Sequence, residues 1–152
     1  MFRLNRLTDY AVVLLTQMAV RPGEWHSAQH IADQGALPLP TVAKLLNALA
    51  REGIVASHRG AAGGYTLGRP AAAISVADIV QALEGPIALT ACVEGSAEAC
   101  VVETLCPMAG NWNKVNQAIR QALASVSLAE MAASAGTHAR PSLNETIRQV
   151  AS

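Results

Sequence analysis

Hydrophobic residues recur at helical spacing in three segments of the first 53 residues. The first segment has apolar positions three or four residues apart, at Leu4, Leu7, Ala11, Leu14, Leu15 and Met18. A shorter second segment follows Ser27, a residue type that caps helices, and ends at Gly35. The third segment begins at the proline-containing residues 38–40 and ends at Gly53. Its apolar face consists of Val42, Leu45, Leu46 and Leu49. The pattern therefore predicts three successive helices.

The hydrophobic period changes after the third helix. Residues 54–57 and 65–67 are predicted to be two short strands, and the glycine-rich residues 58–64 form a turn flanked by basic residues. Three helices followed by a hairpin are the layout of a winged helix-turn-helix, whose third helix enters the major groove of DNA. We therefore predict a mostly α protein with a winged helix-turn-helix DNA-binding domain over residues 1–70.

Residues 71–90 are predicted to contain a connecting helix. Ser75 and Asp78 have the spacing of a capping box, and Gly85 with Pro86 ends the helix. Its apolar face consists of Val76, Ile79, Val80 and Leu83. The next segment, residues 91–110, has no clear period and contains every cysteine of the chain.

Residues 111–133 are predicted to contain a long C-terminal dimerisation helix, with the helical pattern over about 111–125 and a short extra turn over 127–131. Its apolar positions are Trp112, Val115, Ile119, Ala122, Leu123 and Val126. A helix that extends beyond a small domain must bury this face, and a second copy of the chain is the simplest partner. The pattern therefore predicts a homodimer joined through this helix. The remaining residues, 134–152, are predicted to be a flexible tail.

Composition and charge exclude several classes of protein. Apolar residues make up 51% of the 152 residues and charged residues only 14%, which argues against a disordered chain. The longest apolar run, residues 10–15, is too short to span a membrane, and we expect a cytoplasmic protein. Residues 1–70 carry seven basic and four acidic side chains, whereas residues 71–152 carry four basic and seven acidic ones. A net charge of +3 on the first part permits, but does not require, binding to a polyanion.

The predicted helix-turn-helix and hairpin supply the candidate DNA contacts. In such folds the start of the third helix reaches base edges or phosphates, and the hairpin can enter the minor groove. The corresponding residues here are Ser27, Gln29, Pro40, Thr41, Lys44, Arg51, His58 and Arg59. The same layout also occurs in scaffolds that bind no DNA. The glycines of residues 58–64 are not a phosphate-binding P-loop, because no Gly-Lys-Ser/Thr follows and a strand comes next.

The three cysteines, Cys92, Cys100 and Cys106, lie within 15 residues of one another. Thiolates are soft ligands that suit iron–sulfur clusters, zinc and copper(I), although the close pair typical of zinc ribbons is absent. A redox-active thiol set and three ordinary buried thiols are the alternatives. An odd count in a cytoplasmic chain argues against a disulfide framework. A metal centre with three thiolates would need a fourth ligand from elsewhere.

No pattern of residues points to an enzyme. The four histidines, His26, His30, His58 and His138, are scattered and have no nucleophile nearby in the sequence. The acidic residues form no evident pair for acid–base catalysis. We therefore expect no catalytic residues and no small-molecule substrate.

Several stretches together resemble the Rrf family of iron–sulfur winged-helix transcription regulators. They are residues 7–11 (LTDYA), 40–46 (PTVAKLL), 57–65 (SHRGAAGGY), 82–87 (ALEGPI) and the three cysteines, and the resemblance extends over residues 1 to about 133. Residues 85–90 and 111–113 are similar to the branch that regulates the SUF genes for iron–sulfur cluster assembly. The resemblance implies a homodimeric repressor in which the helix around residues 112–124 crosses its mate. It also implies a 2Fe-2S or 4Fe-4S cluster on Cys92, Cys100 and Cys106, whose state changes the affinity for an operator.

This chain differs from part of the family at two positions, which concern the fourth ligand of the cluster and the residue that reads a base. Some members use a histidine three residues after the last cysteine, where this chain has Ala109. Nitric-oxide-sensing relatives use an aspartate near the start of the first helix of the opposite subunit, and Asp9 matches it, with Glu103 or Glu94 as substitutes. Ala43 stands where some relatives read a base with glutamate. Base discrimination is then expected from Thr41, Lys44 and Arg59.

Two alternative functions of the same fold remain open at this point. The match of Asp9 also fits a nitric-oxide-sensing repressor of nitrosative-stress genes. A zinc- or thiol-based redox regulator that never carries iron would use the same three cysteines.

Overall fold

The computed structural model describes residues 3–61, 63–102 and 105–135, and its first two helices begin at side-chain caps. Helix α1 (Arg6–Val20) begins where the Asn5 side chain accepts a hydrogen bond from the Leu7 amide at 3.0 Å. Helix α2 (Ala28–Gly35) begins where Ser27 accepts one from the His30 amide at 3.1 Å. Helix α3 (Leu39–Arg51) follows Pro38. The three predicted helices are confirmed.

Helix α2 ends at Gly35, as the sequence predicts. Gly35 is the last helical residue, and the left-handed position belongs to Ala36, with φ of 51°. Gly35 is required for packing, because a Cβ there would lie 2.7 Å from Cδ2 of Leu14 in α1. The glycine therefore permits close contact between α1 and the end of α2.

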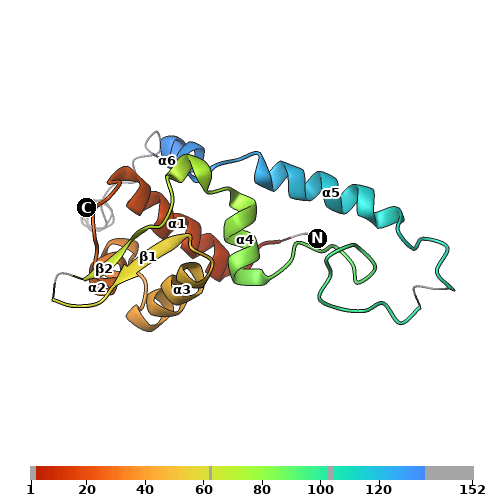
Figure 1. Cartoon of the computed structure of the whole chain (residues 1–152), viewed down its shortest axis with the longest axis horizontal. Coiled ribbons are helices and arrows are strands. Elements are labelled where there is room, and N and C mark those ends of the chain that lie inside the picture. The colour runs from red at the N-terminus through yellow and green to blue at the C-terminus, as the bar shows by residue number, and fades with distance from the viewer. Residues whose placement is uncertain (1–2, 62, 103–104, 136–152) are drawn as a thin grey trace, which may run out of the picture.

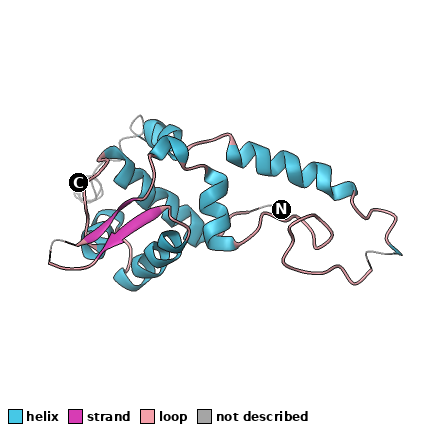
Figure 2. Ribbon diagram, viewed as in Figure 1, coloured by secondary structure: helices cyan, strands magenta, loops and turns pink. Residues whose placement is uncertain are grey.

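The predicted hairpin is present as strands β1 (Val55–His58) and β2 (Gly64–Leu67), which pair antiparallel with Val55 opposite Leu67 (Figure 2). The His26 backbone adds two hydrogen bonds to Tyr65, at 2.9 and 2.8 Å. A Cβ at Gly64 would lie 2.5 Å from the His26 carbonyl oxygen. Glycine at this position therefore lets the segment before α2 approach the hairpin.

One apolar cluster holds α1, α2, α3, β1, α4 (Val76–Glu84) and α6 (Leu128–Ala135) together. Its members with no exposed surface are Ala11, Leu14, Leu15, Val42, Leu46, Leu49, Ile54, Ile74, Ile79 and Leu128. The predicted capping box at the start of α4 is confirmed, because Ser75 and Asp78 exchange hydrogen bonds of 2.9 and 3.1 Å. A single 3-10 turn, η1 (Ala71–Ala73), connects the hairpin to this helix.

The range 111–133, predicted as a long helix with a short extra turn over residues 127–131, contains two helices. Helix α5 (Asn111–Ala124) extends away from the rest of the molecule, whereas α6 packs on α1 (Figure 1). The break occurs because the Ser127 amide and hydroxyl both donate to the Glu130 carboxylate at 2.7 Å, which starts a new helix. These hydrogen bonds also lower the pKa of Glu130. Residues 134 and 135, assigned to the tail from the sequence, belong to α6, and residues 136–152 lie outside the described part of the chain.

The described structure thus consists of a head, residues 3–84 and 126–135, and an arm, residues 85–125. The arm contains the cysteine loop, residues 85–110, and α5 (Figure 1). Along the arm, Ile119 and Leu123 of α5 pack on Val76, Val80 and Ile87. Among the helices described, none has the length and apolar character needed to cross a bilayer.

We expect the substitution Leu128→Ala to lower the free energy of unfolding by about 2–5 kcal/mol, because it would leave a cavity in the core of the head. Met131→Ala, on the same helix but at a side chain that is 37% exposed, should cost under about 1 kcal/mol. Urea denaturation followed by circular dichroism measures both. Equal losses in the two variants would show that α6 does not belong to the core of the head.

Candidate nucleic-acid interface and cysteine loop

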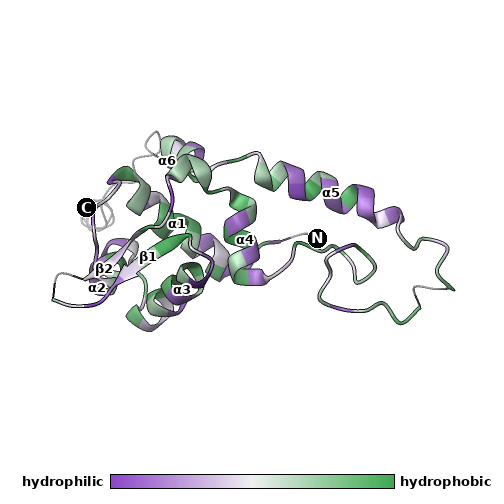
Figure 3. Ribbon diagram, in the orientation of Figure 1, coloured by the Kyte–Doolittle hydropathy of each residue, from purple (hydrophilic) through white to green (hydrophobic). Residues whose placement is uncertain are grey.

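Helix α3 carries core residues on one face and predicted DNA-contacting residues on another. Its residues Leu45, Leu46 and Leu49 are buried, and this orientation leaves Pro40 and Lys44 exposed on another face. Thr41 is half-buried, and its amide donates to the Pro38 carbonyl at 3.0 Å. Figure 3 shows α1 mostly in hydrophobic green, as expected for a helix at the centre of the head. The first turns of α3 therefore present a cation and a proline at the surface.

The two candidate residues near α2 are exposed but already have partners. The Ser27 hydroxyl accepts the capping hydrogen bond from His30, and the Gln29 amide donates to Asp33 at 2.7 Å. A backbone phosphate could still approach the positive end of α2. Ser27 is placed there as a cap, and the Gln29 amide has a second N–H and a carbonyl oxygen that the bond to Asp33 does not use.

The hairpin turn carries two of the predicted residues into solvent. His58 and Arg59 are both exposed, and the hairpin lies on the same side of the head as α2 and α3 (Figure 1). Within the residues that the structure describes, Lys44, Arg51 and Arg59 form no salt bridge. Cations without a carboxylate partner remain available for phosphates. The structure thus brings all three to the accessible surface of the head.

Sequence reasoning missed the residues between α1 and α2 that line the hairpin. The Trp25 ring meets His58 edge-on with centroids 5.9 Å apart, and Trp25 is 47% exposed. The His26 and His30 rings stack at 5.3 Å, and His26 Nε2 lies 3.8 Å from the Glu24 carboxylate. No local motif marks this cluster, because only the pairing of His26 with Tyr65 brings it to the hairpin.

The three cysteines lie on the loop that joins α4 to α5 and are free thiols, each half-buried. Cys92 Sγ lies 3.2 Å from the Thr90 hydroxyl. Asp9 is exposed in the first turn of α1, in the head. Throughout residues 3–61, 63–102 and 105–135, no three histidine, cysteine or acidic side chains lie close enough together to hold a metal ion. Glu103 lies outside these residues, so the predicted ligand set stays a prediction.

The donor chemistry of the loop nevertheless suits an iron–sulfur cluster. Three thiols on one short segment are the soft ligands that such clusters require. Residues 100–106 would have to approach Cys92 for one group to be shared. The side chains of Val101 and Leu105 are 99% and 86% accessible, so neither packs against the head or α5.

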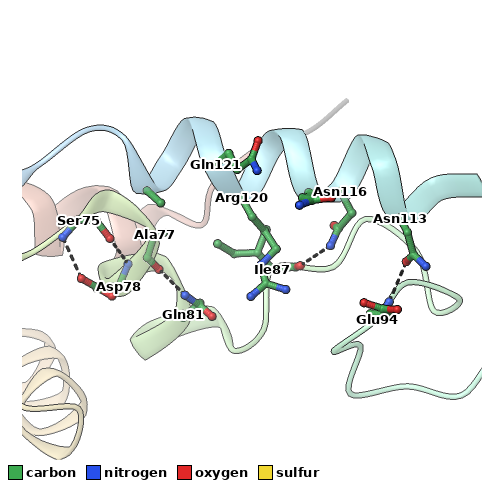
Figure 4. Close-up of a pocket in the computed structure, with 12 residues that line it drawn as sticks. Ser75, Ala77, Asp78, Gln81, Ile87, Glu94, Asn113, Asn116, Arg120 and Gln121 are labelled. Atoms are coloured by element: carbon green, nitrogen blue, oxygen red, sulfur yellow. Dashed lines mark hydrogen bonds between the residues drawn. The ribbon is translucent and has the colours of Figure 1, made fainter. Parts of the chain in front are cut away.

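Two asparagines of α5 hold the first part of the cysteine loop. Asn116 is buried, donates to the Ile87 carbonyl at 3.0 Å and accepts from the Leu89 amide at 3.0 Å. Asn113 accepts from the Glu94 amide at 2.9 Å. These residues line a groove of about 510 Å³ between α4 and α5 (Figure 4). Neither asparagine had a predicted role, because residues 111–113 contributed only to the family resemblance.

Comparison with known proteins finds a family match and similar solved structures. Residues 4–134 match the model of the Rrf2 family, described as an iron-dependent transcriptional regulator. The chain is similar to CymR, the global cysteine regulator of B. subtilis, with 30% identity, a TM-score of 0.67 and coverage of 88% of this chain and 98% of that one. It is similar to IscR of T. potens, with 28% identity, a TM-score of 0.65 and coverage of 95% and 96%. The oxidised form of CymR from Staphylococcus aureus matches with 27% identity, a TM-score of 0.62 and coverage of 86% and 96%.

We expect Lys44→Ala and Arg59→Ala each to weaken binding to operator DNA by about fivefold to tenfold and to reduce the salt dependence by roughly one phosphate contact. Lys114→Ala removes the same charge from α5 in the arm and should change binding by less than about twofold. Gel-shift titrations at two fixed salt concentrations measure these effects. An unchanged affinity in Arg59→Ala would refute the role of the hairpin.

Proposed function

The chain belongs to the Rrf2 family of transcriptional regulators, and from this we propose that it is a dimeric repressor that senses an iron–sulfur cluster and controls the genes for cluster assembly. Members of this family are DNA-binding regulators and not enzymes, and they are usually dimeric. The cluster, the SUF target and the dimer of this chain are the proposed parts. The similarity of residues 85–90 and 111–113 to the SUF branch supports the choice of target.

One observation carries the proposal, namely the position of the cysteines. Three free thiols lie on the loop that leads from the last helix of the head into α5. A change in the distances between these thiols requires a change in the conformation of the loop, which joins α4 to α5. A sensor at this place can therefore alter how α5 is oriented, and with it the relation between two heads.

Cys92, Cys100 and Cys106 would hold the cluster, and Asp9 of the partner subunit would be the fourth ligand. When bound, the cluster supplies a centre that oxidants, iron limitation and nitric oxide can alter. A carboxylate is a hard ligand and is readily replaced at iron, which suits a sensor. Asp9 is exposed at the start of α1 and so is accessible to a second chain.

The exposed face of α5 supports a dimer. Trp112 and Val115 are 41% and 44% exposed on this helix, and the groove beside it is open. Two heads joined through α5 would present two copies of α3 to DNA. Their recognition helices would need a separation near one turn of DNA, about 34 Å, to occupy two half-sites. The proposed sensor would act by biasing this separation.

A thiol-based redox regulator is the second candidate, and two observations favour it. The chain is similar to CymR from two organisms, described in one case as a cysteine regulator and in another in an oxidised form. The three thiols are partly exposed and free, so oxidants can reach them. This candidate uses the same head and the same loop but carries no iron.

Purification without oxygen tests the cluster directly. We expect a coloured protein with visible absorbance, and with iron and acid-labile sulfide in a constant ratio to the chain. Replacing all three cysteines by serine should remove colour, iron and sulfide, because oxygen ligands bind clusters poorly. Absorption spectroscopy and metal analysis provide the measurement. A colourless wild-type protein would leave only the thiol regulator, and unchanged repression by the triple variant in cells would exclude both candidates.

The fourth ligand has its own test. We expect Asp9→Ala to change the visible spectrum and to lower iron retention, because it would leave one iron without its protein oxygen. Glu98→Ala, at an exposed carboxylate within the cysteine loop, should leave both properties unchanged. Iron content and circular dichroism in the visible range are measured under anaerobic conditions. A wild-type spectrum in Asp9→Ala would exclude Asp9 and direct attention to Glu94.

A further inference from the structure

We propose that Asn113 and Asn116 are positioning residues that fix Cys92 on α5, so that Cys92 is the stationary thiol toward which Cys100 and Cys106 must move. The inference deepens the proposed function, because it states which part of the cysteine loop is preformed. It depends on hydrogen bonds and burial, and it applies equally to a thiol regulator without iron.

Cys92 lies between two backbone positions that are hydrogen-bonded to α5. The Leu89 amide, three residues before Cys92, donates to Asn116, and the Glu94 amide, two residues after it, donates to Asn113. Figure 4 shows both asparagines pointing from α5 toward residues 87–94. Asn113 and Asn116 are three positions apart, so both amides lie on the same side of the helix. The backbone that carries Cys92 is therefore held at both ends by one surface of α5.

The attachment by Asn116 is strong because its side chain is buried and forms two hydrogen bonds. Asn116 is only 3% exposed, and its amide nitrogen and oxygen are both satisfied by the loop backbone at 3.0 Å. A buried side-chain amide that loses its partners pays a large desolvation cost, so this pair of bonds resists separation. Val93, next to Cys92, is 5% exposed and adds apolar burial. The segment 87–94 is thus attached by polar and apolar contacts together.

Cys100 and Cys106 differ from Cys92 in the hydrogen bonds of the backbone around them. In the described parts of residues 96–110, the hydrogen bonds join nearby positions of the loop, as between the Leu105 amide and Val102 and between the Ala109 amide and Cys106. The hydrogen bonds that reach α5 from this part start at Met108 and Gly110 and end on its first turn, at Asn111 and Asn113, and among the described residues none links Cys100 or Cys106 to α5 or to the head. Val101 and Leu105 are almost fully exposed. Cys100 and Cys106 therefore lack the anchors that hold Cys92.

The consequence concerns the direction of the signal. If Cys92 moves with α5, thiol chemistry that draws Cys100 and Cys106 toward it rearranges residues 95–110 and leaves the contact between α5 and residues 87–94 intact. Any strain produced in this way acts on the joint between α4 and α5, because the loop connects them. Asn113 and Asn116 thus make α5 part of the sensor.

The test measures the reactivity of each cysteine in reduced protein from which metal has been removed with a chelator. Pulsed alkylation with iodoacetamide, followed by peptide mass spectrometry, gives one rate for each thiol. We expect Asn116→Ala to raise the rate of Cys92 by at least about fivefold, since it removes two hydrogen bonds and the loss of even one shifts a local opening equilibrium by roughly that factor. The rates of Cys100 and Cys106 should change by less than about twofold. Asn113→Ala should have a smaller effect of the same kind.

Two further variants separate positioning from general loss of structure. Asn113→Asp keeps an acceptor for the Glu94 amide and should restore the wild-type rate of Cys92, which a merely destabilised helix would not do. Gln117→Ala removes an exposed α5 amide that has no hydrogen bond among the described residues, and it should leave all three rates unchanged. Circular dichroism confirms that each variant is folded. If Asn116→Ala unfolds, Asn113→Ala against Asn113→Asp provides the comparison.

The outcomes distinguish this inference from the proposed function. An unchanged Cys92 rate in folded Asn113→Ala and Asn116→Ala, or an equal rise in all three thiols, would overturn the positioning role. A wild-type protein without iron would contradict cluster sensing and leave the alkylation result valid. A selective rise at Cys92 would support the positioning role for either kind of sensor.

Discussion

The arm of this protein is fixed to the head at both of its ends, and this constraint governs the rest of the structure. Immediately before the arm, Glu84 of the head accepts hydrogen bonds from the Asn5 amide and from the buried Thr8 hydroxyl. Immediately after the arm, the Val126 carbonyl accepts from the Val76 amide at 2.9 Å, and the Leu128 amide donates to the Ile74 carbonyl at 2.8 Å. The chain therefore leaves the head after α4 and returns to it before α6, and both points are held by hydrogen bonds. A rearrangement inside it must be accommodated between α4 and α5.

This constraint connects two regions that lie far apart in the molecule. The hairpin and α3 lie at one end, and the cysteine loop lies at the other (Figure 1). Helices α1 and α4 lie between them and share the core of the head with α3. Because Glu84 precedes the cysteine loop and holds the start of α1, the loop begins at a rigid part of the head. A signal from the thiols can reach the DNA-binding surface through this packing or through a second chain on α5.

The elements that the sequence predicted well are those with local causes. Ser27 caps α2 and Ser75 with Asp78 caps α4, because a side chain can satisfy a nearby amide wherever the helix lies. The apolar faces of α1 and α3 also follow from spacing alone, and both enter the core as expected. A short extra turn was predicted over residues 127–131, and the structure has the longer helix α6 there. The apolar pattern continues through Val126 and Leu128, and the capping at the start of α6 depends on two residues, Ser127 and Glu130.

The sequence by itself determined the order of helices and strands, the exposed cations of the first half and the grouping of three thiols on one loop, because each depends on neighbours in the chain. Tertiary structure decided which groups meet across long separations. It placed Trp25 beside the hairpin, seated Leu128 in the core of the head, and brought Asn113 and Asn116 to the segment that holds Cys92. An asparagine on a helix has the same local propensity whether it faces water or a loop backbone. Only the folded path of residues 87–94 supplies the donors and acceptor that give these two side chains their role.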